Sequence, residues 1–200
     1  MSARDRSIAC MLGGAIGDAL GVAQEIFPNS RDLRKIHQTV LASRRSELQK
    51  DYENGGPWVK KGLVVKAGEW TDDTAMMLCL ADSILTQKTI KVSDLMVRFV
   101  RWWYHGINSC TGYSIGLGGN IRKAITLFDT ENPDKILGGT DPDTDAGNGS
   151  LMRLAPVPIY WSDNLGSAIY YARLQTSTTH NVSETLDGSS LMCYIIWSVS

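Results

Sequence analysis

The chain has 200 residues, 43% of them hydrophobic, which is enough to build the core of one globular domain. Its 20 basic and 21 acidic residues nearly cancel, so the composition lacks the positive charge typical of proteins that bind nucleic acid or an anionic membrane surface. We therefore expect a single domain over residues 1–200, no nucleic-acid or membrane partner, and a local site for any anionic ligand.

The cysteines and the apolar segments indicate a cytoplasmic protein. The four cysteines are widely spaced without a CxxC pair, and Cys79 lies in an apolar periodic segment, as buried reduced thiols do. The apolar stretch over residues 8–16 follows a basic start, but Asp5 and Asp18 are not typical of an export signal. The apolar run over 191–199 is too short to span a bilayer.

The first predicted helix spans Ile8 to Glu25 and carries a glycine at every fourth position from 13 to 21. Glycine costs roughly 1 kcal/mol in a helix interior, so this glycine face favours close approach of another backbone, most simply by helix packing. Asp18 and Glu25 lie two turns apart on one face, with Asp18 among apolar neighbours. A carboxylate buried there needs a partner.

A polar stretch over residues 28–68 follows, with a possible surface helix over 32–50 and a turn at 54–57, and is interpreted as a connection. The next helix, over 72–85, is apolar nearly all round, which is typical of a central, buried element. The later helices are expected at 93–103 with Ser93 or Asp94 as cap, at 120–128, at 151–161 with interruptions at Pro156 and Pro158, at 165–176 and at 183–197. Since no sustained strand alternation appears, the predicted fold class is all-α.

Two acids at the start of the 72–85 helix allow two interpretations. As a helix start, Thr71 would accept from a free amide, and Asp72 and Asp73 would favour the positive end of the helix dipole. As a metal site, the same three residues offer only oxygen donors, which suit Mg²⁺, Mn²⁺ or Ca²⁺. Because an apolar helix follows directly, we expect the two charges to need a counter-cation and favour the metal site.

Two glycine-rich segments are candidate binding loops. Gly147, Asn148, Gly149 and Ser150 stand directly before a helical segment, where free amides can cradle a phosphate, and residues 110–119 offer further sites of backbone approach. Either loop alone is more often a turn, but the two together suit a ligand with a diphosphate. His180 lies in a polar run and, taken alone, predicts a surface or capping histidine. The sequence carries no zinc pattern, GxSxG elbow or P-loop.

Five segments resemble the ADP-ribosylglycohydrolase family, particularly its dinitrogenase reductase-activating glycohydrolase branch. They are GAIGDALGVAQE, GEWTDDTAM, TGYSIG, GNGSLMRLAPV and TTH, in the family's order and roughly its spacing over almost the whole chain. The resemblance implies an all-α orthogonal multi-helix bundle with a two-metal centre of Mg²⁺ or Mn²⁺. It also implies a hydrolase that removes ADP-ribose from a modified protein side chain, often arginine.

The resemblance also assigns roles to single residues. Thr71, Asp72 and Asp73 match N-terminal metal ligands, and Glu25 matches the acid on a segment that closes over the metals and the ribose. In such a centre the metals orient the ribose hydroxyls and activate a water, Glu25 manages a proton, and the carboxylates favour a positively charged ribosyl transition state. The positions that match substrate contacts are Ser114, Gly116, Ala146, Gly147, Asn148, Gly149, Ser150 and His180.

Two departures from the family pattern leave alternatives open. The arginine-specific branch has an aspartate where this chain has Ser114, so the acceptor side chain stays undecided. The family closes its metal centre with a C-terminal Gly-Asp-Thr-Asp-Thr motif that these 200 residues lack, so we expect a bundle without that part. The similar GGTDPDTDAG at 138–147 directly precedes GNGS, out of the family's order, and its Asp141, Asp143 and Asp145 are interpreted as loop acids because Pro142 favours a turn.

Three hypotheses follow for the function. The first is a metal-dependent ADP-ribosylglycohydrolase, and the second is an inactive relative that binds ADP-ribose. The third is one part of a split enzyme, in which a second chain supplies the missing metal ligands and the apolar segment over 191–200 forms the interface.

Overall fold

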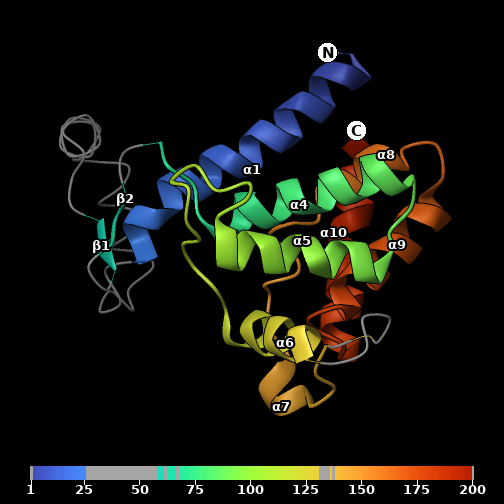
Figure 1. Cartoon of the computed structure of the whole chain (residues 1–200). Coiled ribbons are helices and arrows are strands. Elements are labelled where there is room, and N and C mark those ends of the chain that lie inside the picture. The colour runs from blue at the N-terminus through green and yellow to red at the C-terminus, as the bar shows by residue number, and fades with distance from the viewer. Residues whose placement is uncertain are drawn as a thin grey trace. The chain divides into compact units, whose positions relative to one another are not determined.

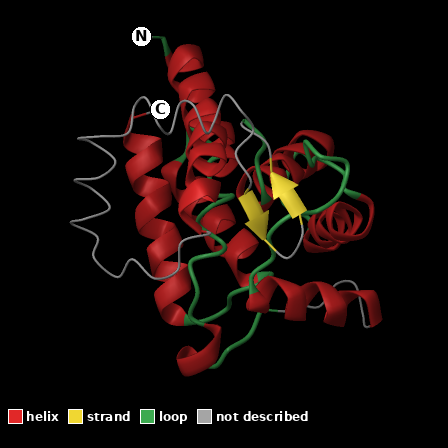
Figure 2. Ribbon diagram, turned by 90° about the vertical axis from the view of Figure 1, so that its left-hand side faces the viewer, coloured by secondary structure: helices red, strands yellow, loops and turns green. Residues whose placement is uncertain are grey.

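The computed structural model describes residues 2–25, 58–60, 63–65, 68–130, 136 and 138–199, and in these ranges helices predominate (Figure 2). The elements are α1 (Ala3–Glu25), β1 (Trp58–Lys60), β2 (Leu63–Val65), α4 (Asp72–Gln87), α5 (Val92–His105), α6 (Gly119–Thr130), α7 (Pro142–Asp145), α8 (Pro156–Tyr160), α9 (Leu165–Ser177) and α10 (Ser183–Val199). The predicted all-α class is confirmed. The surface helix expected over 32–50 and the turn at 54–57 lie outside the described residues.

The chain forms two compact units, one of residues 1–15 with 71–200 and one of residues 16–70. In the second unit β1 and β2 pair antiparallel, with Trp58 opposite Val65 and Lys60 opposite Leu63. The sequence predicted no strand here, because three residues are too few to show an alternating pattern.

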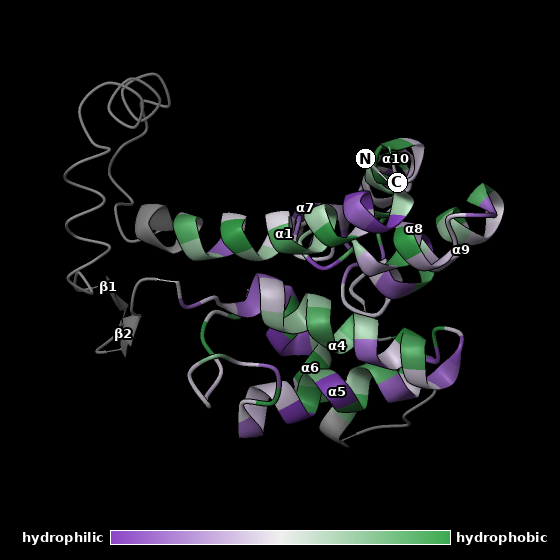
Figure 3. Ribbon diagram, turned by 90° about the horizontal axis from the view of Figure 1, so that it is seen from above, coloured by the Kyte–Doolittle hydropathy of each residue, from purple (hydrophilic) through white to green (hydrophobic). Residues whose placement is uncertain are grey.

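In the first unit α4 and α5 pack side by side and form the centre of the core (Figure 1). As its apolar sequence predicts, α4 is buried on most sides, and burial raises the pKa of the Cys79 thiol to about 11. Polar and apolar bands alternate along α5 in Figure 3, and its buried face consists of Leu95, Met96, Phe99 and Trp102.

The N-cap of α5 is Lys91, so the predicted cap at Ser93 or Asp94 is wrong. Asp94 has a different task, because its carboxylate accepts from Ser83 Oγ at 2.7 Å and from Arg98 Nε at 2.8 Å. The Ser83 contact links α5 to α4, whereas Arg98 lies on α5 itself. Burial alone would raise the pKa of Asp94, but these hydrogen bonds lower it. The acid therefore joins two helices and does not begin one.

The remaining helices extend the packing outward from this pair. α6 packs on α5, α8 packs on α4, and α9 and α10 pack on α8 and on each other. The helix predicted over 151–161 is shorter than expected, since turns precede α8 and the helix begins at Pro156. Proline suits the first helical position because its missing N–H has no partner there in any helix.

Close approach along α1 occurs at a different glycine from those predicted. A Cβ placed on Gly14 would lie 3.3 Å from the Met77 sulfur, whereas one on Gly13, Gly17 or Gly21 meets nothing within 4 Å among the described residues. Asp18 is only half-buried, so the expected buried carboxylate is wrong as well. No helix in the described part of the chain is long and apolar enough to cross a membrane.

Candidate functional site

The start of α4 places the predicted metal ligands at one helix end. Thr71 is the N-cap residue and is buried, with its carbonyl accepting from Ala75 N at 3.2 Å. Its side chain makes no capping hydrogen bond, so the position of the predicted cap is confirmed and its expected contact is wrong. Asp72 and Asp73 occupy the first turn and are half-buried, where the helix dipole favours negative charge.

The loop before α6 brings Gly116 against Asp72. Gly116 has a φ of +82°, and a Cβ on it would overlap the Asp72 carboxylate. Only glycine meets both demands, because it tolerates a left-handed backbone and leaves room for the acid. Ser114 in the same loop donates from Oγ to the Trp103 carbonyl at 2.8 Å and so fastens the loop to the end of α5.

The second glycine loop lies against His180. A Cβ placed on Gly147 would lie 3.2 Å from His180 Nε2, and one on Gly149 would lie 3.1 Å from its Cε1. Ala146 and Asn148 are exposed, while Ser150 is fully buried and its hydroxyl has no hydrogen-bond partner within the described ranges. Among the predicted substrate contacts, the structure thus brings Gly147, Gly149 and His180 together.

His180 itself is buried, with 3% of its surface exposed, which corrects the surface or capping position that its polar run alone predicts. Burial and the nearby charge of Arg153 lower its pKa to about 4, and the charge of Asp145 acts in the opposite direction. The imidazole is therefore neutral at physiological pH. Thr179 Oγ1 lies 2.8 Å from its Nδ1.

A short segment links the two groups of residues. Asn120 lies beside the second loop, since a Cβ on Gly147 would be 3.4 Å from Asn120 Nδ2, and this amide donates to the Asp145 carbonyl at 3.0 Å. Only three residues separate Gly116 from Asn120, so the Cα atoms of these two lie at most about 14 Å apart. The Asp72 contact and the second glycine loop therefore flank the same short segment.

The acids of the 138–147 segment form a one-turn helix, α7, where the sequence predicted a plain loop. Asp141 is its N-cap and accepts from Asp143 N at 3.0 Å, while Pro142 takes the first position. Asp145 is buried beside Lys123, whose Nζ lies 3.5 Å away. These contacts give Asp141 and Asp145 structural tasks.

The predicted metal ligands lie together at the start of α4. Thr71, Asp72 and Asp73 are hard oxygen donors of the type that Mg²⁺ and Mn²⁺ prefer. Within the described part of the chain no group of three or more His, Cys, Asp or Glu side chains lies close enough to hold a metal ion. The donor set fits one side of a coordination shell. Glu25 ends α1, and its side chain is outside the described set, so its role stays a prediction.

Sequence reasoning missed Arg153, which is fully buried in the first unit. Its Nε donates to Gln175 Oε1 at 2.8 Å, and its guanidinium lies 4.7 Å over the ring of Phe99. Burial lowers the pKa of Arg153 to about 9, which leaves it charged at neutral pH. The available signal was a single arginine within the apolar run LMRLAPV, where a charge requires buried partners.

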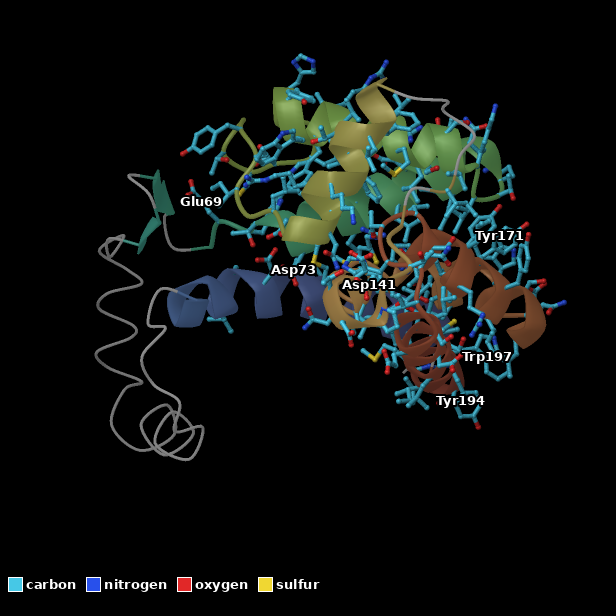
Figure 4. All side chains as sticks on the ribbon, turned by 90° about the horizontal axis from the view of Figure 1, so that it is seen from below. Glu69, Asp73, Asp141, Tyr171, Tyr194 and Trp197 are labelled. Atoms are coloured by element: carbon cyan, nitrogen blue, oxygen red, sulfur yellow. The ribbon has the colours of Figure 1, made fainter. Side chains whose placement is uncertain are left out.

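Figure 4 shows Asp73 well apart from Tyr194 and Trp197 on α10, so the α10 surface is separate from the start of α4. The apolar side chains exposed on α10 are Leu191, Met192, Tyr194, Ile195 and Val199.

Comparison with known proteins identifies relatives of the chain. A family model described as ADP-ribosylglycohydrolase matches residues 1–199. An ADP-ribosylarginine hydrolase Tri1 from Pseudomonas putida is 36% identical over 190 residues, which are 95% of this chain and 45% of the relative. Its namesake from Serratia proteamaculans is 31% identical over 96% of this chain and 46% of its own length. The ADP-ribosyl-[dinitrogen reductase] glycohydrolase of Rhodospirillum rubrum is 27% identical over 90% of this chain and 53% of its own length. The chain thus spans about half the length of these curated relatives.

Proposed function

The chain belongs to the ADP-ribosylglycohydrolase family, and from that premise we propose that it carries the ADP-ribose site of a hydrolase that removes ADP-ribose from a modified protein side chain. The observation that carries the proposal is the juxtaposition of Asp72 with Gly116 and of His180 with Gly147 and Gly149. Its relatives named as ADP-ribosylarginine hydrolases support arginine as the acceptor.

Each element of the site has a separate task in this proposal. The Asp72 and Asp73 carboxylates favour a positively charged ribosyl group and, together with Thr71, would hold Mg²⁺ or Mn²⁺. A bound divalent ion would supply Lewis-acid polarisation and an activated water. The backbone of Gly147 to Ser150 and the buried Ser150 hydroxyl offer hydrogen bonds to the diphosphate. Glu25 would take the proton released when water attacks the anomeric carbon and the glycosidic bond breaks.

A second candidate function is ADP-ribose binding without turnover, which the two glycine loops and His180 would serve by themselves. A third candidate function is that of one part of a split enzyme, in which a second chain supplies the further metal ligands. One experiment separates the first two: release of ADP-ribose from modified arginine and serine peptides with Mg²⁺ or Mn²⁺, beside calorimetric titration with ADP-ribose. Metal-dependent release supports the hydrolase, and binding without release supports the binding module. No binding at all contradicts both.

The metal assignment has its own test. Asp72→Asn and Asp73→Asn should each abolish or weaken Mn²⁺ binding by at least about tenfold, because a neutral amide replaces a carboxylate ligand. Glu184→Gln is the matched control, since Glu184 is also an acid in the first turn of a helix but belongs to α10. Unchanged Mn²⁺ affinity in both aspartate variants would show that these acids only favour the helix start.

A further inference from the structure

Arg153 organises the turn that follows α9. Its Nη2 lies 3.0 Å from the Gln175 carbonyl oxygen, 3.2 Å from Thr178 Oγ1 and 2.7 Å from Thr179 Oγ1. Because Nη2 carries two hydrogens, these three acceptors share them, and the contact to Thr179 is the shortest. Arginine has donors and no acceptor, so each of these oxygens must accept. The direction of the Arg153–Thr179 hydrogen bond is therefore fixed by chemistry.

That direction determines where the Thr179 proton goes. Thr179 is fully buried, and within the described residues its hydroxyl contacts only Arg153 and His180 Nδ1, the latter at 2.8 Å. If Nδ1 carried a proton and donated to Thr179, the threonine O–H would be buried without an acceptor, which is unfavourable. The satisfied arrangement has Thr179 donating to an unprotonated Nδ1.

A neutral imidazole with a bare Nδ1 carries its proton on Nε2. The charged groups near the ring are Arg153 and Asp145, and Asp145 is itself engaged by Lys123 Nζ at 3.5 Å and by Asp141 N at 3.2 Å. Burial and Arg153 keep the ring neutral by lowering its pKa to about 4. Nε2 has no hydrogen-bond partner in the described part of the chain and faces the α-carbons of Gly147 and Gly149.

We propose that Arg153 and Thr179 are positioning residues that hold His180 in the Nε2–H tautomer. In this tautomer His180 Nε2 donates a hydrogen bond to an oxygen of a ligand bound at the Gly147–Gly149 loop. This inference rests on the proposed ADP-ribose site for the identity of the ligand, whereas the tautomer is a property of the free protein. It assigns His180 the role of a donor and excludes that of a general base through Nε2.

The test begins with the tautomer in the unliganded 200-residue chain. Nitrogen NMR of ¹⁵N-histidine-labelled protein at pH 7 should show His180 with a bare Nδ1 and a protonated Nε2. Thr179→Val removes the hydroxyl and should give a mixture of tautomers or the reverse one. Thr179→Ser restores the hydroxyl and should restore the wild-type signal. A protonated Nδ1 in the wild-type chain would overturn the proposal.

The ligand arm uses calorimetric titration with ADP-ribose. Thr179→Val should weaken binding by about threefold to tenfold, the range expected for one hydrogen bond, and Thr179→Ser should not. Thr178→Val is the matched control, because Thr178 is equally buried and accepts from the same Arg153 nitrogen but does not contact His180. It should destabilise the protein similarly and leave both tautomer and affinity unchanged.

The outcomes distinguish this inference from the proposed function. A changed tautomer in Thr179→Val with unchanged ADP-ribose affinity would overturn the donor role of His180. Equal effects of Thr178→Val and Thr179→Val on the tautomer would show that general packing sets it. That result would overturn the positioning role of Thr179. If the wild-type chain binds no ADP-ribose, the proposed function fails. The NMR experiment still decides whether Arg153 and Thr179 fix the tautomer of His180.

Discussion

The start of α4 and the turn after α9 both gather polar side chains, but they treat charge in opposite ways. Asp72 and Asp73 are half-buried at a helix end, where the dipole stabilises them and water or a ligand can reach them. Arg153 is fully buried, and neutral oxygens and an aromatic ring surround its charge. An accessible charge can exchange its partners for a ligand, whereas a buried one fixes the groups around it.

The largest expected effect comes from removing the buried charge. Arg153→Met keeps most of the apolar stem but leaves four acceptor contacts without their donor, on Gln175, Thr178 and Thr179. Buried unsatisfied polar groups are costly, so we expect the free energy of unfolding to fall by about 3–5 kcal/mol. Urea denaturation at pH 7 measures the change.

Arg173→Met is the control for that substitution. Arg173 Nη1 pairs with Asp187 at 2.7 Å, but the two side chains are 41% and 73% exposed. Because water screens such a pair, its loss should cost less than about 1 kcal/mol. A similar loss in both variants would contradict the distinction between buried and accessible charge.

The pH dependence of stability tests the same turn by a milder change. His180 has a folded-state pKa of about 4, below its ordinary value of 6.5, because it is buried near Arg153. The unfolded chain therefore binds the proton more readily, so the stability is complete above pH 6.5 and is lost as the pH falls towards 4. We expect a loss of about 2 kcal/mol between pH 7 and pH 5.

Urea unfolding at several pH values measures this slope against two variants. His180→Asn should flatten it, since the amide oxygen can accept from Thr179 without titrating. His105→Asn should leave it intact, because His105 is exposed at the end of α5. If the His180 variant keeps the full wild-type slope, the acid sensitivity originates elsewhere.

The contrast between the two regions also explains what the sequence could predict. The helices followed from apolar periodicity, and α4 was correctly expected to be central because its apolar residues cover most of its circumference. The acids at its start were visible because charge at the edge of an apolar run stands out. The two glycine loops were also visible in the sequence, whereas His180 was selected by the family resemblance, which neither composition nor periodicity would have done.

The contacts between distant segments could not be predicted. Nothing local links Gly116 to Asp72 or Arg153 to Gln175, and the Asp94 cap failed because a tertiary partner on α4 outcompeted the local one. Glycine spacing misplaced the close approach on α1, since the rotation of a helix about its axis is set by its neighbours. Single-chain patterns give the elements, and packing decides which side chains meet.

A smaller effect is expected at the contact between Gly116 and Asp72. Gly116→Ala adds a methyl group where the Asp72 carboxylate lies and strains a backbone with φ of +82°. The displaced carboxylate should lower Mn²⁺ affinity by about tenfold, equivalent to roughly 1–2 kcal/mol. Gly118→Ala is the control, since its Cβ would meet only Ile121 Cδ1, at 3.9 Å. Calorimetry with Mn²⁺ compares the two variants, and equal affinities would contradict a role for this contact.

The smallest effect on stability should come from the acids themselves. Asp73→Asn removes a charge from the first turn of α4, where an acid contributes about 0.3–1 kcal/mol through the helix dipole. In urea unfolding without divalent ions, the variant should therefore lose less than about 1 kcal/mol, far less than Arg153→Met. With saturating Mn²⁺ the wild-type chain should gain stability, because a metal that binds the folded state stabilises that state. The variant should not gain stability, since it lacks one carboxylate ligand. A loss of several kcal/mol without metal would instead show that Asp73 holds the fold, as Arg153 does.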